Sequence, residues 1–238
     1  MVGDLRGARF LVIGGSSGIG LAVAKQAFAE GARVHIASRS RAKLDKAVSE
    51  IGSGSVGREL DVTDDEAVDS FFAPEGEWDH VVVSAAETVS GPMRKQTMED
   101  ARKTMMSKFW GAYHVARSAR ISQQGSLCLV SGFRSFRPSA NTVLQGAINA
   151  ALEALARGLA LELAPIRVNV VSPGLTATPM WSGMSEGDRG TMFGNAAKNL
   201  PAGRVGQPDD MANAVLFLAK TPFATGSTVL VDGGGTIA

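Results

Sequence analysis

The sequence predicts an α/β fold, a single doubly wound parallel sheet of about seven strands with helices on both faces. Seven short apolar runs alternate along the chain with six longer segments of helical periodicity, the order typical of parallel strands joined by crossover helices. The runs VVV (81–83) and LCLV (127–130) lack alternating polar residues, which indicates strands that are buried on both sides. A glycine-rich segment directly follows the first run, where sheets of this kind place a tight turn.

The elements can be assigned in order from apolar patterning and from the residues that end each helix. Expected strands cover residues 8–14, 33–38, 55–60, 79–85, 125–131, 166–172 and 227–233. Expected helices cover residues 18–31, 41–52, 64–72, about 98–119, about 141–163 and 208–219. We therefore expect one domain over residues 1–238. Residues 175–206, rich in Gly, Met and Thr, are long for a connection, and we expect them to form a substrate loop or lid.

Composition and charge disfavour several classes of function. The net charge of the 238-residue chain is only +1, so no global field favours nucleic acid or an anionic membrane. No stretch reaches the roughly 18 apolar residues that a membrane span needs. Cys128 is the only cysteine, which excludes an intrachain disulfide, and the N-terminal apolar run is too short for a secretory signal. We expect a cytoplasmic protein without a metal site, because His35, His80 and His114 lack ligand spacing.

The segment GGSSGIG at residues 14–20 predicts a dinucleotide-binding loop of the Rossmann type. Gly14 allows the tight turn, Gly18 lets the backbone approach a pyrophosphate, and Gly20 lets the helix pack closely on the sheet. The helix N-terminus then offers unpaired N–H groups to phosphate. The remaining predicted contacts of this loop are Ser16, Ser17 and Ile19.

The end of the second strand, Ser38-Arg39-Ser40, indicates which cofactor is used. A carboxylate at this point would bind the ribose 2′-hydroxyl of NAD, whereas an arginine accommodates the 2′-phosphate of NADP. Neither Ser38 nor Arg39 is acidic, so we expect NADP. The alternative is that Arg39 is simply solvated at the start of a helix.

Over essentially its full length the chain resembles the short-chain dehydrogenase/reductase family. The resemblance is carried by the glycine loop and by the segments LDVTD, VSAA, LALEL, IRVNVVSPGLTATPM, GRVGQPDDMANAVLFLA and TGSTVLVDGG. It implies that Asp61 and Val62 flank the adenine and that Ala85 and Ala86 line the ribose side. It also implies contacts to the nicotinamide end and the phosphates from Pro173, Gly174, Thr176 and Thr178.

Members of this family typically carry Asn, Ser, Tyr and Lys as an acid–base set, and the chain differs at all four positions. LALEL sets the register of the fifth helix and puts Gln145 at the tyrosine position and Asn149 at the lysine position. Arg137-Pro138 puts Gly132 at the serine position, with Ser131 adjacent. Gly111 puts Lys108 at the asparagine position.

The replacements leave Lys108 as the one titratable group at the expected site. Gln145 can only form hydrogen bonds, and Asn149 could hold the nicotinamide ribose without charge. Burial could lower the pKa of Lys108 toward the working range. We therefore expect Lys108, helped by Ser131 and Gln145, to orient the substrate oxygen and deliver its proton. The alternative is that Lys108 fills its position structurally. The only tyrosine, Tyr113, is interpreted as core or subunit-interface packing.

The leading interpretation is an NADP-dependent oxidoreductase with altered proton delivery, which moves hydride between NADP(H) and a small carbonyl or alcohol substrate or an unsaturated bond. Two alternatives stay open, a redox-inactive NADP-binding sensor or scaffold and a non-redox isomerase or lyase. Several basic residues in the loops would favour an anionic substrate if they converge on Lys108: Arg94, Lys95, Arg134 and Arg137. The helices near 98–119 and 141–163 carry apolar residues on more than one face, so we expect a homotetramer or homodimer.

Overall fold

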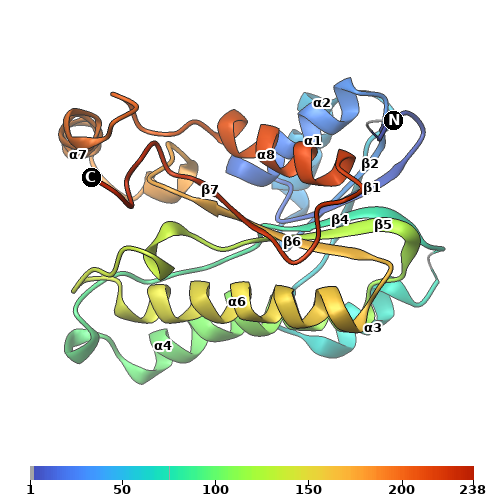
Figure 1. The fold of residues 1–238 in the computed structure, drawn as a ribbon, viewed down its shortest axis with the longest axis horizontal. Helices are drawn as coiled ribbons and strands as arrows, with labels where there is room; N and C mark the ends of the chain where they lie inside the picture. Colours follow the sequence, from blue (N-terminus) through green and yellow to red (C-terminus); the bar gives the residue numbers. More distant parts are fainter. Residues whose placement is uncertain (1–2, 75) are drawn as a thin grey trace.

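A computed structural model describes residues 3–74 and 76–238 and confirms the predicted fold class. One sheet of seven parallel strands crosses the molecule in the order β3-β2-β1-β4-β5-β6-β7 (Figure 1). The strands are β1 (Arg9–Ile13), β2 (Arg33–Ser38), β3 (Val56–Glu59), β4 (Trp78–Val83), β5 (Ile121–Val130), β6 (Arg167–Pro173) and β7 (Thr228–Val231).

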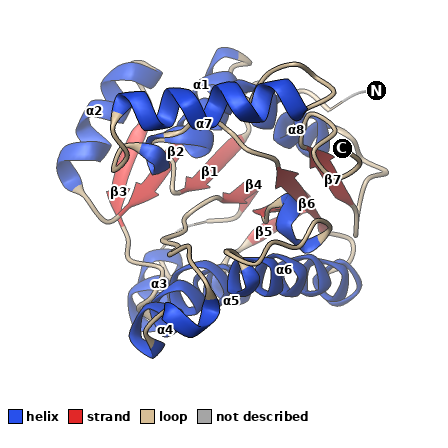
Figure 2. Cartoon of the chain, turned by 90° about the vertical axis from the view of Figure 1, so that its left-hand side faces the viewer, coloured by secondary structure: helices blue, strands red, loops and turns tan. Residues whose placement is uncertain are grey.

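Helices cover both faces of this sheet, as Figures 1 and 2 show. One layer contains α1 (Gly18–Ala29), α2 (Arg41–Ile51) and α8 (Pro208–Lys220), with α7 (Glu186–Asn199) at its end. The other contains α3 (Asp65–Phe72), α4 (Met98–Met105), α5 (Gly111–Ser118) and α6 (Val143–Glu162). Among the described residues, no helix combines the length and the apolar character needed to cross a membrane.

The core follows from the two-residue period of the strands. In β1, Leu11 and Ile13 face the layer that contains α6, whereas Phe10 and Val12 face the layer that contains α1 and α8. All four side chains are essentially inaccessible to solvent. This two-sided burial explains why β1 reads as a continuous apolar run, and it fixes the ends of the strands that carry the site.

The order of the strands reverses at β1. The chain runs outward from β1 to β2 and β3, then returns to the other side of β1 with β4. Loops that leave β1 and β4 at their carboxyl ends therefore turn to opposite faces. In open parallel sheets, ligands bind at this reversal.

Two segments differ in detail from their predicted form. The long helix predicted near 98–119 is present, but a π-helical turn, η2 (Met106–Trp110), separates α4 from α5. The connection 175–206 is not an irregular loop throughout, because it contains a short 3-10 turn, η4 (Pro179–Trp181), and the 14-residue helix α7. Ser185 begins α7 by accepting a hydrogen bond from the backbone N–H of Asp188 at 3.1 Å. None of the α7 residues is buried, so the sequence has no apolar stripe from which this helix could be predicted.

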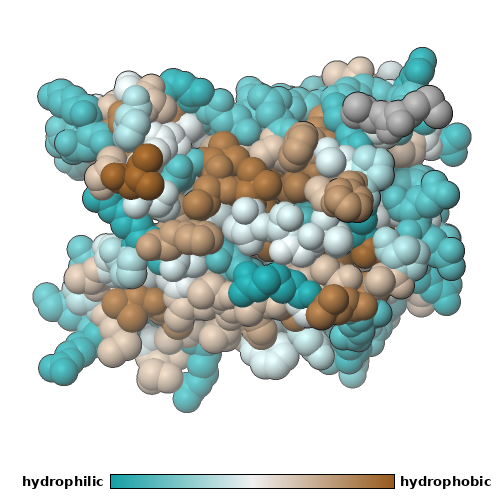
Figure 3. Space-filling view, in the orientation of Figure 1, coloured by the Kyte–Doolittle hydropathy of each residue, from teal (hydrophilic) through white to brown (hydrophobic). Residues whose placement is uncertain are grey.

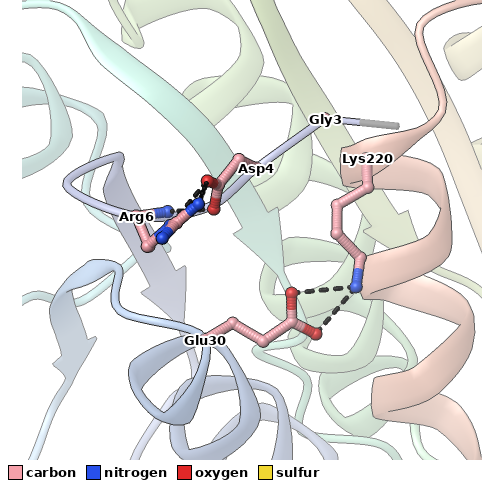
Figure 4. Close-up of a pocket in the computed structure, with 5 residues that line it drawn as sticks. All are labelled: Gly3, Asp4, Arg6, Glu30 and Lys220. Atoms are coloured by element: carbon pink, nitrogen blue, oxygen red, sulfur yellow. Dashed lines mark hydrogen bonds and ion pairs between the residues drawn. The ribbon is translucent and has the colours of Figure 1, made fainter. Parts of the chain in front are cut away.

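The beginning of the described chain is tied to α8 at a shallow hollow on the surface (Figure 4). The Gly3 backbone N–H donates to Lys220 O at 2.9 Å, and the Lys220 ammonium pairs with Glu30 at 2.7 Å. Asp4 and Arg6 pair with each other beside it. These charges neutralise one another, so the described residues that line the hollow offer no unpaired charge to a ligand.

Candidate active site at the carboxyl edge of the sheet

The glycine loop after β1 forms a close-fitting turn against β4. Gly14 has a φ of +85°, and a β-carbon on it would lie 2.5 Å from the backbone nitrogen of Ala85. A β-carbon on Gly20 would collide with the carbonyl oxygen of Gly14, so only glycine fits there. Ser17 precedes α1 without bonding to the first backbone N–H groups, which leaves them available to phosphate. Ser16 and Ile19 lie half-buried in the same turn.

The end of β2 carries a buried hydroxyl beside a cation. The Ser38 Oγ is buried and has no hydrogen-bond partner among the described residues. Arg39 pairs with Glu87 at 3.0 Å, and Glu87 also pairs with Lys103 at 2.6 Å. Hydrogen bonding from Lys103, assisted by Arg39, lowers the pKa of the Glu87 carboxyl. Ser40 has a structural task, because its hydroxyl caps α2 through the Lys43 N–H.

The residues expected around the adenine and the ribose lie in the turns after β3 and β4. Asp61 accepts hydrogen bonds from the Thr63 backbone N–H at 3.0 Å and from its hydroxyl at 2.8 Å. Val62 packs against Gly111 of α5, where a β-carbon would come within 2.6 Å of the valine methyl. Ala85 lies against Gly14, and Ala86, the next residue, is exposed.

The segment after β6 brings the predicted nicotinamide side to the glycine loop. Gly174 lies directly after Pro173, the last residue of β6, and packs against Asp232. The Thr176 hydroxyl donates to Gly174 O at 3.0 Å and holds the turn. The Thr178 side chain then lies over Gly18, 3.4 Å from the place where a β-carbon would sit. The ends of β1, β2, β4 and β6 therefore meet at one edge of the sheet.

Lys108 projects from the π-helical turn η2 toward α6 and the end of β5. Its ammonium donates to Asn149 Oδ1 at 2.7 Å and to the backbone oxygen of Ser131 at 2.9 Å. Asn149 is buried at 3% exposure; Lys108 is half-buried as a residue, but its ammonium is surrounded by protein. Burial lowers the pKa of Lys108 to about 8, opposed by the negative charge of Glu153. π-helical turns are frequent at functional sites, and this one directs a titratable group inward.

Ser131 connects Lys108 to Glu153, a buried acid that the sequence analysis did not identify. The Ser131 hydroxyl donates to Glu153 Oε1 at 2.9 Å, and the Ser135 hydroxyl donates to the same oxygen at 2.7 Å. Glu153 lies on α6 with only 5% of its surface exposed. Its position four residues after Asn149, within the apolar stripe of α6, was a signal available in the sequence.

Gln145 is engaged elsewhere, so the predicted trio is only partly assembled. Its side-chain amide donates to Ser90 Oγ at 3.0 Å and to Val89 O at 3.4 Å, in the loop after β4. No hydrogen bond joins it to Lys108 among the described residues. The structure thus brings Lys108 to the Ser131 backbone and to Asn149, whereas Gln145 fastens the neighbouring loop to α6.

Of the four basic loop residues, Arg134 and Arg137 lie near each other, whereas Arg94 and Lys95 lie in a different turn. Arg134, in the 3-10 turn η3 (Phe133–Ser135), lies over the Phe133 ring at 4.4 Å, and burial, with the charge of Arg137, lowers its pKa. Arg137 donates to the backbone oxygen of Gly235. Arg94 and Lys95 lie exposed in another 3-10 turn, η1 (Met93–Lys95), apart from the Lys108 hydrogen bonds.

The contacts described for Tyr113, His80 and His114 do not include Lys108. Tyr113 is 39% exposed and packs edge-on against Trp110, so it is not a core residue. His80 contacts the Ser126 hydroxyl at 2.9 Å, and burial lowers its pKa to about 4, which leaves it neutral near pH 7. His114 contacts Val62 O at 3.0 Å. No cluster of three or more His, Cys, Asp or Glu residues suited to a metal ion occurs within the described ranges.

Comparison with known proteins places this arrangement in a family. A family model described as Enoyl-(Acyl carrier protein) reductase matches residues 13–236. A short-chain dehydrogenase/reductase of Stachybotrys chlorohalonatus is 33% identical over 97% of each chain. The D-erythrulose reductase of Gallus gallus is 32% identical, over 97% of this chain and 96% of the relative. A solved structure described as a small-chain dehydrogenase in complex with NADPH is 38% identical, with a TM-score of 0.85 over 98% of this chain and 100% of that chain. The chain therefore belongs to the short-chain dehydrogenase/reductase family.

Proposed function

We propose that the protein is an NADP-dependent oxidoreductase that transfers hydride between NADP(H) and a small carbonyl or alcohol substrate, with Lys108 as its proton-delivering group. The observation that carries this proposal is the Lys108 ammonium, held between Asn149 and Ser131 at the carboxyl edge of the sheet. The family supplies the reaction type, and proton delivery by Lys108 is the part that we propose for this chain.

The residues at the edge of the sheet fit the proposed cofactor. The glycine loop leaves space where a β-carbon would otherwise sit, and α1 presents unpaired N–H groups to a pyrophosphate. Ser38 offers a buried hydroxyl that has no partner among the described residues, and Arg39, which pairs with Glu87 in the structure, offers a cation for the 2′-phosphate. NADPH, when bound, supplies the hydride. The solved relative described as a complex with NADPH supports the same choice.

Lys108 supplies what the amide of Gln145 lacks, a proton that can leave near neutral pH. With a pKa lowered to about 8, the ammonium is protonated at pH 7 and is a stronger acid than an ordinary lysine. Asn149 and the Ser131 carbonyl both accept hydrogen bonds from it and so fix its direction. The third N–H of the ammonium is left for a substrate oxygen. After transfer, the neutral amine must regain a proton, ultimately from solvent, before the next turnover.

The test is NADPH oxidation against a panel of ketones and aldehydes, with Lys108→Met beside the parent. We expect turnover by the parent and a reduction of roughly 10²–10⁴-fold in Lys108→Met, with NADPH affinity nearly unchanged. Lys46→Met, at an exposed lysine of α2, is the matched control and should retain the parent rate. Parent-like turnover in Lys108→Met would remove Lys108 from the mechanism. NADPH binding without oxidation of any substrate would instead indicate a redox-inactive binding protein.

A further inference from the structure

We infer that Glu153 is a positioning residue that keeps Lys108 charged and oriented, acting through Ser131 without touching the substrate. The inference rests on the proposed function of Lys108, which it deepens by assigning control of its protonation to a second buried group. It is carried by a continuous set of contacts from the π-helical turn to the middle of α6.

The contacts form a bridge with Ser131 at its centre. The backbone oxygen of Ser131 accepts from the Lys108 ammonium, while the hydroxyl of the same residue donates to the Glu153 carboxylate. Ser135 donates a second hydroxyl hydrogen bond to the same carboxylate oxygen. One residue therefore joins a buried cation to a buried anion, and both lie where water has little access.

Burial strengthens the interaction between the Lys108 ammonium and the Glu153 carboxylate. An isolated carboxylate at 5% exposure is expensive to keep charged, and so is an ammonium surrounded by protein. Each charge offsets part of the penalty of the other. The effective dielectric constant between them is lower than in water, so their attraction is strong even without direct contact.

The other charged side chains near Lys108 either have partners of their own or are exposed to solvent. From the loop after β4, Glu87 faces the N-terminal side of η2, but Arg39 and Lys103 already pair with it. From η3, Arg134 lies over Phe133 with Arg137 beside it. The remaining charged residues of α6, Arg157 and Glu162, are exposed to solvent. Among the described residues, Glu153 is thus the acid placed to act on Lys108.

The experiment compares the parent with Glu153→Gln, which keeps the shape of the side chain and removes its charge. The pKa of Lys108 is measured directly by NMR of ¹³C-labelled lysine, with the signal assigned from its loss in Lys108→Met. We expect the pKa of Lys108 to fall by about one unit, the low end of the range for the loss of a nearby opposite charge. Glu162→Gln, the same change at an exposed position of α6, should leave the Lys108 pKa unchanged.

The pH profile of turnover gives a second reading that a merely structural role would not move. In Glu153→Gln the high-pH limb of kcat should shift to lower pH by the same amount, with little change in KM, and Glu153→Asp should restore most of the shift. A Lys108 pKa in Glu153→Gln equal to the parent value would overturn the inference. The NMR titration needs no substrate, so it can fail or succeed independently of the proposed oxidoreductase activity.

A folding failure of Glu153→Gln would leave a second variant, Glu153→Met, which replaces the carboxylate with an apolar side chain suited to a buried position. The same NMR titration should again show a lower Lys108 pKa than in the parent. A Lys108 pKa in Glu153→Met equal to the parent value would equally overturn the inference.

Discussion

Gly132 and Asn149 fit together so closely that a side chain at position 132 would displace the Asn149 amide. A β-carbon on Gly132 would lie 2.9 Å from Asn149 Nδ2, closer than real contacts of this kind. The Asn149 side chain has little room to retreat, because it is 3% exposed and accepts the Lys108 hydrogen bond. The small residue at 132 is therefore a condition for the Lys108–Asn149 pair.

Gly132→Ser should weaken both the fold and the reaction. The added side chain pushes Asn149 out of place, and overpacking of this kind typically destabilises a protein by about 1–3 kcal/mol. Thermal unfolding and turnover would measure the two effects. Gly158→Ser is the control, because Gly158 lies on α6, as Asn149 does, and a β-carbon there would have open space around it. Equal melting temperatures for the two variants would show that Asn149 can move after all.

Exchanging Lys108 and Asn149 should preserve the stability that Asn149→Lys alone loses. Asn149→Lys alone places a second ammonium where Lys108 Nζ already lies 2.7 Å from Asn149 Oδ1. We expect this variant to be unstable or to lose its charge at one lysine, because two like charges cannot share the site. The double variant Lys108→Asn/Asn149→Lys keeps one ammonium and one amide, so it should recover most of the stability. Calorimetry of the three proteins measures this, and additive losses would contradict it.

Cofactor preference should depend on Arg39 and respond to Glu87. Arg39→Ala should weaken NADPH binding by about 1.5–3 kcal/mol, the range for a hydrogen bond to a charged group, with little effect on NADH. Glu87→Gln removes the partner that holds Arg39 in the structure. Because that pair is exposed, its loss should tighten NADPH binding by only about 1 kcal/mol or less. Fluorescence titration decides both points, and equal affinity of the parent for NADPH and NADH would refute the assignment.

The rate of carbonyl reduction should fall as the pH rises past about 8. A general acid acts in its protonated form, and the pKa of Lys108 is about 8 rather than the usual 10.5 because of burial. Turnover should be constant below pH 7 and decline about tenfold per unit well above pH 8, while oxidation of the alcohol should show the opposite trend. A pH–rate series in both directions tests this. A flat profile from pH 6 to 10 would exclude Lys108 as the donor.

We expect the protein to form a dimer or tetramer through two exposed apolar surfaces. Trp110 and Tyr113, 41% and 39% exposed, form one beside α5. Phe217 and Leu230 belong to the other, and Figure 3 shows apolar residues gathered over α8 and β7. Light scattering at micromolar concentration should report an oligomer, and Phe217→Asp or Trp110→Asp should each remove one contact. A monomeric parent protein would contradict this expectation.

The sequence predicted the sheet well because strand patterning is local. The seven apolar runs became seven parallel strands, and the glycine loop lies where its spacing placed it. β5 begins earlier than expected, at Ile121, because Ile121 pairs with Trp78 ahead of a register shift. The stretch between this pair and the regular ladder includes the exposed residues Gln123 and Gln124. Polar residues at the start of a strand do not give the apolar pattern by which a strand is predicted.

The candidate site was less accessible to sequence reasoning because its contacts join distant segments. Lys108 could be singled out, but which atoms of Ser131 and Asn149 it meets depends on how η2, β5 and α6 pack. Gln145 was expected beside Lys108, yet a loop 55 residues away provides its partner Ser90. Glu153 was overlooked because a single acid in an apolar helix reads as an exposed face until its neighbours are known.

The π-helical turn at Met106–Trp110 gives this segment one residue more than a regular helix would hold. Each residue advances a helix by about 100°, so the extra residue rotates α4 relative to α5. Thr104, before the turn, and Ser107, near its start, accept hydrogen bonds from the backbone of Val89 and Glu87. After the turn, Gly111 packs on Val62. Deleting any one residue here would restore a regular helix but set these two groups of contacts out of phase. The number of residues in this segment is therefore constrained by the contacts on both sides of it. Relatives that share Lys108 should have the same number of residues between Thr104 and Gly111.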